Sequence, residues 1–316
     1  MQKKETAKYD RRRGPERRSA EQAFLILPVL SGILWGSASI FIRGLTDAGM
    51  DNVTILGARM SVSAVILFLG LLIYDKRMLV IHIRDLWIFV LLAILGMLGL
   101  NYCYNVSVNS LTVSLAAVLM GLSPVYVMIM ARFLFGERIT VKKVFCTALA
   151  VFGCVLVSGL VSGGGEYSPV SLFFGLMSGF LYGLYGILSK VAMGKGYHAF
   201  TITFYSVFIS GIAMIPFADW GMIAGYATAA PAVHGGFLLL QSLCTSVLPY
   251  VLYTLSQIYV ETGKVAILAS GAEPSAAMVF GALIFAEIPS IFNIAGLIIT
   301  IAALSVLCAP EKKKLH

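Results

Sequence analysis

Charge is scarce in this sequence, and its scarcity excludes most soluble folds. Only 12% of the 316 residues are Asp, Glu, Lys or Arg, whereas 59% are hydrophobic; soluble domains are about a quarter charged. Residues 24–42, 86–99 and 291–307 contain no charge at all. So little polar surface cannot cover the core of a soluble protein of this size. We therefore predict an integral membrane protein.

Cysteine and histidine are also sparse, which argues against a metal centre. The five cysteines lie within apolar segments, and none stands at a metal-ligand spacing from the four histidines. The glycine tract at 163–165 is followed by Glu166 rather than by Lys-Ser/Thr, so no phosphate-binding loop is implied. We expect no metal, no cofactor and no enzymatic activity, and any transport must run on gradients.

Ten apolar segments are each long enough to cross a membrane as a helix. A helix needs roughly 20 residues to span about 30 Å of hydrocarbon, whereas a barrel strand needs only about ten residues of alternating polarity. The predicted fold is an all-α integral membrane protein with ten transmembrane helices. They are expected at 24–43, 53–74, 86–107, 111–135, 143–161, 170–190, 200–219, 235–259, 265–286 and 290–309.

Lys and Arg are distributed unevenly between the connections. They crowd residues 1–22, a charge block too long for a signal peptide and without the aromatic or structured scaffold of a nucleic-acid site. They recur in alternate connections, while the intervening connections hold acids only: Asp47, Asp51, Glu166, Asp219 and Glu287. By the positive-inside rule, the tails 1–22 and 310–316 are both cytoplasmic.

The chain repeats itself. SGILWGSASIFIRG at 31–44 and SGFLYGLYGILSKV at 178–191 are 147 positions apart, and SPVYVMIMARFLFGE, ending at Glu137, has a counterpart 150 positions later that ends at Glu287. Each copy holds five spans, an odd number, so the copies must face opposite ways across the membrane. We predict two inverted repeats, 23–162 and 163–309, as in many secondary transporters. A duplicated structural bundle is the alternative.

A family resemblance rests on two motifs and their second copies. The motifs are the opening LWG…R at 34–43 and the ending P…LFGE at 124–137. Over residues 25–309 the chain resembles the drug/metabolite transporter superfamily, EamA type. The resemblance implies a bacterial inner-membrane carrier, often an exporter of amino acids or other small metabolites. It also points to an arginine in the second span, Arg59, and to the pair Glu273–Pro274 in the ninth.

Glu273 is the one acid placed deep in a predicted span, where a charge costs about 2.5–3.5 kcal/mol. It is either a proton-coupling or substrate-amine site, or a neutral glutamate bonded to a neighbouring helix. Pro124 and Pro274 each remove a helical hydrogen bond, either beside a central cavity or only at a bend. Arg59 either snorkels or pairs with a carbonyl, or recognises an anion. The predicted coupling or gating residues are Glu273, Pro124, Pro274 and Arg59.

Two polar stripes follow a four-residue spacing that keeps side chains on one helix face. They are Asn101, Asn105 and Asn109 in the third span, and Gln241, Thr245, Pro249, Tyr253 and Gln257 in the eighth. Unpaired amides are unfavourable in lipid, so both stripes should face inward, as interhelical bonds or as cavity lining. The predicted binding residues are Trp35, Ser39, Asn101, Asn105, Tyr182, Tyr185, Tyr253, Gln257 and Glu273.

These observations favour a secondary active transporter that exports a small metabolite such as an amino acid by alternating access. The alternatives are a flippase for a lipid-linked head group, a non-transporting receptor or assembly subunit, and an intramembrane enzyme, which would need more ionisable groups at one depth. The expected partners are a small-molecule substrate and the lipid bilayer, with a proton as candidate coupling ion and no nucleic acid. The chain is expected to act as a monomer or homodimer.

Overall fold

The computed structural model describes residues 22–110, 116, 119–157, 168–286 and 288–309. The predicted tails, Glu287, the boundary between the predicted repeats and the side chain of Asn109 lie outside the described residues. All regular structure in the described ranges is helical, with no strand among them. The expectation of an all-helical protein is confirmed over these ranges.

Six helical segments are long and apolar enough to span a membrane, and three shorter apolar helices accompany them within the described ranges. The long segments are Gln22–Asp47, Asn52–Tyr74, Ile83–Ser107, Pro169–Gly194, Pro231–Ser256 and Thr262–Phe285; the shorter ones are Ser123–Phe135, Ala199–Met214 and Ile291–Leu307. All nine fall on predicted spans. The fifth predicted span, 143–161, overlaps the helix Val141–Val157, and the count of ten crossings stays a prediction.

The first half of the chain contains interrupted as well as continuous helices. Its elements are α3 (Ile26–Gly36), α4 (Ala38–Asp47), α5 (Asn52–Tyr74), the short turns η1 (Lys76–Leu79) and η2 (Ile83–Asp85), α6 (Leu86–Leu91), the π-helical η3 (Leu92–Gly99), α7 (Leu100–Ser110), α9 (Ser123–Phe135) and α10 (Val141–Val157). The first predicted span is therefore broken at Ser37, whose hydroxyl bonds to the carbonyl of Leu34 at 2.6 Å.

The second half begins with a continuous helix. Its elements are α11 (Pro169–Gly194), α12 (Ala199–Met214), α13 (Trp220–Ala229), the π-helical η5 (Pro231–Gly235), α14 (Gly236–Ser242), the π-helical η6 (Leu243–Val247), α15 (Leu248–Ser256), α16 (Thr262–Phe285) and α17 (Ile291–Cys308). Helix α13 was not expected from the sequence. It follows Asp219, whose carboxylate accepts a hydrogen bond from the Met222 amide at 2.9 Å and so caps a helix between two spans.

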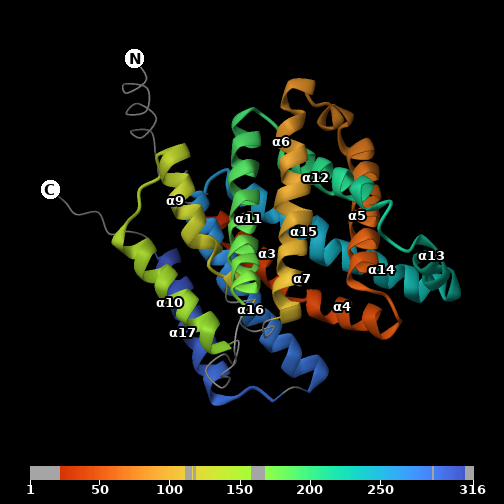
Figure 1. Ribbon diagram of the computed structural model, residues 1–316. Coiled ribbons are helices and arrows are strands. Elements are labelled where there is room, and N and C mark those ends of the chain that lie inside the picture. The colour runs from red at the N-terminus through yellow and green to blue at the C-terminus, as the bar shows by residue number, and fades with distance from the viewer. Residues whose placement is uncertain (1–21, 111–115, 117–118, 158–167, 287, 310–316) are drawn as a thin grey trace.

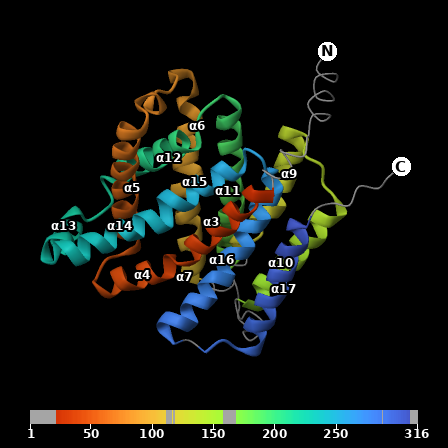
Figure 2. The ribbon, with the colours of Figure 1, turned by 180° about the vertical axis from the view of Figure 1, so that it is seen from behind.

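The helices form two flanking pairs around a central group. Helices α10 and α17 lie side by side at one edge of the molecule and α5 and α12 at the opposite edge, with α3, α11, α15 and α16 between them (Figures 1 and 2). The largest buried cluster joins η3, α11, α12 and α15 around Tyr185, Tyr250 and Met97. The candidate site lies in this central group.

Two helix crossings in the central group depend on glycine. A Cβ atom added to Gly36 of α3 would lie 2.6 Å from the carbonyl oxygen of Glu273, and one added to Gly32 would clash with the carbonyl of Ala269. On α11, a Cβ atom at Gly179 would lie 2.7 Å from the carbonyl oxygen of Leu119. Small residues thus bring α3 onto α16, and α11 onto the chain leading into α9, at backbone contact, as in close helix pairs within membranes.

Candidate functional site

Glu273 lies midway along α16 and is bonded to a tyrosine of α11. The hydroxyl of Tyr182 donates to Oε2 of Glu273 at 3.3 Å. Tyr182 is only 7% exposed, and Glu273 is half-buried. The carboxyl group therefore faces other helices, which is where an ionisable group within a membrane-spanning segment is tolerated.

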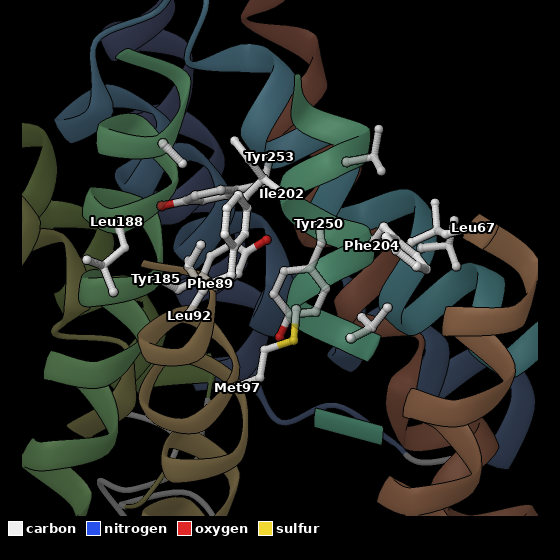
Figure 3. Packing of buried hydrophobic residues seen from close by; sticks show 14 of the residues in the cluster. Leu67, Phe89, Leu92, Met97, Tyr185, Leu188, Ile202, Phe204, Tyr250 and Tyr253 are labelled. Atoms are coloured by element: carbon white, nitrogen blue, oxygen red, sulfur yellow. The ribbon is translucent and has the colours of Figure 1, made fainter. Parts of the chain in front are cut away.

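An aromatic cluster surrounds this pair. Trp35 of α3 contacts the rings of Tyr182, Tyr250 and Tyr253 at centroid distances of 5.6, 5.0 and 5.7 Å. Tyr185 meets Tyr250 edge to face at 4.8 Å, and Figure 3 shows the rings of Tyr185, Tyr250 and Tyr253 turned toward one another. Edge-to-face contacts at these distances are the favourable geometry for aromatic pairs. We call these five side chains the aromatic cluster.

The structure brings together four predicted binding residues here, namely Trp35, Tyr182, Tyr185 and Tyr253. Tyr250 was missed, although its spacing of three residues before Tyr253 was a readable signal, because positions three apart share a helix face. It lay one residue off the polar stripe that the sequence emphasised. In the structure both Tyr250 and Tyr253 contact Trp35 and Tyr185, and Tyr250 makes the closer contacts.

The polar stripe of the eighth span is buried along its whole length. Gln241, Thr245, Tyr253 and Gln257 are each at most 2% exposed, and Pro249 is buried. Gln257 donates from Nε2 to the Gly186 carbonyl at 3.2 Å, and the ammonium group of Lys190 bonds to the Gln257 carbonyl. Gln257 therefore joins α15 to α11.

The third span shows a different pattern. Asn101 donates to the carbonyl of Met97, one turn back in the same span, at 2.7 Å, while Asn105 is half-buried. Ser39 also bonds locally, to the carbonyl of Gly36 at 3.4 Å. No hydrogen bond joins these three side chains to the aromatic cluster among the described residues.

Both spans contain π-helical turns, at Leu92–Gly99 and Leu243–Val247. A π-turn inserts an extra residue and rotates the helix beyond it, and such bulges are frequent at functional sites. The four-residue spacing read from the sequence is therefore interrupted within the stripe of the eighth span, between Gln241 and Pro249, whereas in the third span the π-turn ends before Asn101.

The two prolines occupy different contexts. Pro274 lies inside the continuous helix α16, and the freed carbonyl of Ser270 receives the Cys154 thiol at 3.9 Å. Pro124 lies at the start of α9, after a turn at residues 121–122. The Ser123 and Ser270 hydroxyls approach to 3.1 Å where these helices meet.

Arg59 on α5 is half-buried, and its Nε atom is buried with no hydrogen-bond partner in the part of the chain that the structure describes. No ion pair joins Arg59 to Glu273 among the described side chains.

A separate hollow of about 700 Å³ lies between α5 and α12. It is lined by Ser61, Ala64, Val65, Phe68, Phe208, Gly211, Ile212, Ile215 and Trp220. Ser61 and the indole N–H of Trp220 carry its only polar side-chain atoms, and that N–H is already bonded to the Ile215 carbonyl. Its surface suits hydrocarbon, whereas the aromatic cluster offers hydroxyl and carboxyl groups.

Comparison with known proteins points to membrane transport. The sequence model of the EamA-like transporter family matches residues 22–159 and again residues 170–309. An "Uncharacterized transporter" of Archaeoglobus fulgidus is 27% identical over 275 residues, covering 85% of this chain and 90% of that protein. A "Probable terminal-alkyne amino-acid exporter" of Streptantibioticus cattleyicolor is 24% identical over 220 residues, covering 69% of this chain and 71% of that protein.

A solved structure shares the fold. A crystal structure aligns with a TM-score of 0.72 at 13% sequence identity, covering 90% of this chain and 96% of that one. At this identity the likeness concerns the arrangement of helices alone.

Proposed function

The chain belongs to the EamA-like transporter family, a family of membrane transporters rather than enzymes, and on that premise we propose a secondary active transporter that exports a small metabolite such as an amino acid. The observation that carries the proposal is the Glu273 carboxyl group, held by Tyr182 beside aromatic side chains from three helices. The name of the S. cattleyicolor relative supports an amino-acid substrate. The protein is a multi-pass membrane protein, and we place it in the inner membrane with both tails, 1–22 and 310–316, cytoplasmic.

The proposed mechanism rests on two inverted repeats, 23–162 and 163–309, of five spans each. Equivalent contacts at the glycine crossings support the duplication. Gly36 packs against the carbonyl of Glu273, and Gly183, 147 positions after Gly36, packs against the carbonyl of Ser123, 150 positions before Glu273. Each glycine thus faces the other repeat at the matching residue.

Helix boundaries support the same relation. Helices α5 and α12 begin 147 residues apart, at Asn52 and Ala199, and α10 and α17 begin 150 residues apart, at Val141 and Ile291. Trp35 and Tyr182 are also 147 positions apart and contact each other. A residue that touches its own equivalent lies near a two-fold axis, as in an isologous interface.

Alternating access would then proceed by rocking the repeats about this centre. Glu273 would bind the substrate amine or a coupling proton, with Trp35, Tyr182, Tyr185 and Tyr253 as the wall of the site. Ser39, Asn101, Asn105 and Gln257 remain proposed lining residues, and Pro124, Pro274 and Arg59 proposed gating residues.

A second candidate, a flippase for a lipid-linked head group, is favoured by the apolar hollow between α5 and α12. A lipid tail would occupy that hollow while the head group crosses between the repeats. The two functions differ in the molecule that moves.

Reconstitution tests the proposal. Purified protein in proteoliposomes with an imposed pH gradient should accumulate a radiolabelled solute from a metabolite extract, and Glu273→Gln should remove accumulation. Scrambling of a fluorescent lipid-linked sugar without solute accumulation would favour the flippase. If the proteoliposomes showed neither solute accumulation nor lipid scrambling, the proposal would be overturned.

Topology is tested separately with single cysteines. In a cysteine-free background, Arg138→Cys and Ile288→Cys should be labelled from opposite sides by an impermeant maleimide, since both positions are exposed. Labelling of both from one side would contradict the inverted repeat.

A further inference from the structure

The hollow between α5 and α12 opens to the side of the protein, at an edge of the molecule (Figure 1). Val65, Ile212 and Ile215 in its lining are all exposed. Its volume of about 700 Å³ lies within the range of about 300–1,000 Å³ that is typical of ligand pockets. Because this side of a multi-pass membrane protein faces lipid, and an empty hollow would leave its lining without contacts, the occupant at hand is an acyl chain.

The lining is built from equivalent positions of the two predicted repeats. Eight of the nine lining residues form four pairs whose members are 147 positions apart. The pairs are Ser61 and Phe208, Ala64 and Gly211, Val65 and Ile212, and Phe68 and Ile215. A two-fold relation between α5 and α12 therefore maps the hollow onto itself. If the repeats exchange shapes during transport, the same eight positions still surround the hollow, so an occupant need not leave.

The two helices are in contact beyond both ends of the hollow. A Cβ atom added to Gly57 would lie 2.6 Å from that of Ala218, so α5 and the chain after α12 meet closely near one end. Near the other end the rings of Phe68 and Phe204 stack with their centroids 6.1 Å apart. The hollow is therefore a feature of a tightly crossed pair and not a gap between helices that fail to meet.

Selection of one lipid must come from the polar end of the hollow. Lipid tails are as apolar as leucine, so an apolar lining cannot tell one tail from another. Asp219 is exposed and directly precedes the lining residue Trp220, and its backbone amide donates to the Thr54 hydroxyl at 3.1 Å. The amide of Thr54 in turn donates to the carboxylate of Asp51, also exposed, at 3.1 Å. Thr54 thus ties two exposed carboxylates together at the Trp220 end.

The adjoining sequence supplies no cation for these carboxylates, since residues 44–58 and 199–263 contain no Lys or Arg. Two arginines flank the first of these stretches. Arg43 lies 4.3 Å from the ring centroid of Phe285 on α16, and the Nε atom of Arg59 is buried among the helices. An ammonium group can bond to exposed carboxylates, whereas an anionic head group would be repelled by them. This end of the hollow therefore suits a head group that carries a primary amine.

We propose that the hollow binds one acyl chain of phosphatidylethanolamine, with the ammonium group of that lipid at the carboxylates of Asp219 and Asp51. The lipid stays bound through the transport cycle and fills the hollow between α5 and α12, and it is not the molecule that is transported. In the orientation predicted from the sequence, it belongs to the external leaflet. The proposal requires the membrane-embedded fold and is independent of the transported solute.

Fluorescence quenching by brominated lipids tests the proposal, because Trp220 lines the hollow. The full chain is reconstituted in phosphatidylcholine vesicles that contain a fixed fraction of phosphatidylethanolamine, phosphatidylglycerol or phosphatidylcholine with brominated chains. The fluorescence removed by Trp220→Phe reports on the hollow, and the fluorescence removed by Trp87→Phe reports on an exposed site on α6. At Trp220 we expect phosphatidylethanolamine to bind about three- to fivefold more tightly than the other lipids, the size expected of an exposed ion pair. Trp87 should show no preference for phosphatidylethanolamine.

Asp219→Asn should remove the preference at Trp220 while the protein keeps its fold. The amide oxygen of Asn can still accept the hydrogen bond from the backbone of Met222, so α13 keeps its cap. Asp75→Asn is the matched control, because the Asp75 carboxylate also caps a helical turn, through the Arg77 amide at 2.9 Å, but at the opposite end of α5. It should leave the preference unchanged.

Ala64→Leu tests the hollow itself. The added atoms should occupy the hollow, so quenching of Trp220 should fall for each brominated lipid and the preference should be lost. Gly70→Leu is its control, a small-to-large change on the same helix at an exposed position that does not line the hollow. Thermal unfolding shows whether each variant is folded, and Val65→Phe, at an exposed lining position, gives a second test should Ala64→Leu fail to fold.

Three results would overturn the inference. The first is equal quenching of Trp220 by the three lipids, which would describe ordinary boundary lipid. The second is a preference that persists in both Ala64→Leu and Val65→Phe. The third is faster movement of brominated phosphatidylethanolamine between leaflets in vesicles with the protein than without it, which would make this lipid the transported molecule. Solute accumulation in proteoliposomes is measured separately, so the first two results leave the proposed transporter function intact.

Discussion

At the crossing of α3 with α16 and at the crossing of α11 with α9, glycines at equivalent positions pack against the backbone. The two crossings differ in which of the two helices is continuous. At the first, α3 ends at Gly36 and the chain breaks at Ser37, while α16 runs unbroken through Pro274. At the second, α11 is continuous over 26 residues, while its partner α9 starts only at Ser123. Each crossing therefore pairs one continuous helix with one interrupted helix, and the roles are reversed.

This reversal is what two equivalent repeats in different conformations would produce. If the repeats exchange shapes, α3–α4 straightens while α11 bends, and the open side of the molecule changes. The ionisable group, in contrast, is present in one repeat: α16 has Glu273 where α9 has Ser123, and the equivalent of Tyr182, which bonds to Glu273, is Trp35. Mutations can test which part of the difference matters.

Glu273→Gln should have the largest effect on transport. The amide cannot carry a charge, and a hydrogen bond to a charged group is worth about 1.5–3 kcal/mol, or about 10- to 100-fold in binding or rate. We expect initial rates of solute uptake in proteoliposomes to fall by about that factor. The control is Ser123→Ala at the matching position, which should keep more than half of the rate; equal losses in both variants would show that the crossings act alike.

Gly36→Ala should have the next largest effect, on stability as well as transport. The new Cβ would lie 2.6 Å from the backbone oxygen of Glu273, and overpacking of this kind costs about 1–3 kcal/mol. Gly183→Ala should cost less, because the nearest atom, at 3.0 Å, belongs to the Val127 side chain. Thermal unfolding in detergent would compare them.

Gly70→Ala is the control for the glycine series, since nothing lies within 4 Å of a Cβ atom there. It should be neutral or stabilise α5 by up to about 1 kcal/mol through helix propensity. Destabilisation by Gly70→Ala as large as that by Gly36→Ala would mean that close approach is not what the crossing glycines provide.

Glu137→Ala should destabilise the first turn of α16. The Glu137 carboxylate accepts hydrogen bonds from the backbone amides of Thr262 and Gly263 at 2.8 and 3.2 Å. Loss of such a cap costs about 0.5–2 kcal/mol. The equivalent positions in the other half, Glu287 and residues 112–113, lie outside the described residues.

Thermal unfolding of Glu137→Ala should show this loss, with Glu137→Gln retaining part of the stability because its amide oxygen still accepts a hydrogen bond. Lys143 is 3% exposed and also bonds Glu261 at 2.7 Å, so it keeps an acidic partner in both variants. An unchanged unfolding midpoint in Glu137→Ala would show that this contact does not contribute to the stability of the packing between the halves.

Sequence periodicity predicted the helices well but not their interruptions. Hydrophobic length placed α5, α11 and α16 within a few residues of their observed ends. The break at Ser37 and the π-turns η3 and η6 could not be predicted from the periodicity, because they arise from packing of one helix on another rather than from local preference. The helix α13 was not predicted, because it is too short to span a membrane.

The candidate site was predicted in part. Trp35, Tyr182 and Tyr185 were predicted as aromatic binding residues, and the structure places all three in the aromatic cluster. Asn101 and Ser39 were predicted from helical spacing, yet each bonds within its own span. The difference depends on which way a helix is rotated, and the π-turns change that rotation beyond what spacing reveals.

The smallest expected effect concerns the C-terminal ends of α9 and α16, at Gly136 and Ala286. Both helices end on a left-handed residue 150 positions apart, Gly136 with φ 67° and Ala286 with φ 52°, and Ala286 is the one non-glycine residue with positive φ in the described ranges. A side chain disfavours this conformation. Ala286→Gly should therefore stabilise the protein by about 0.4–1 kcal/mol and Gly136→Ala destabilise it by a similar amount.

Unfolding midpoints of the two single variants and of the double variant measure this difference. The effects should nearly cancel in the double variant, because sites without shared partners act additively. A destabilised Ala286→Gly would mean that the methyl group of Ala286 makes a contact that Gly136 lacks. The two helix ends would then differ in packing as well as in sequence, and the asymmetry of the crossings would extend to the membrane surface.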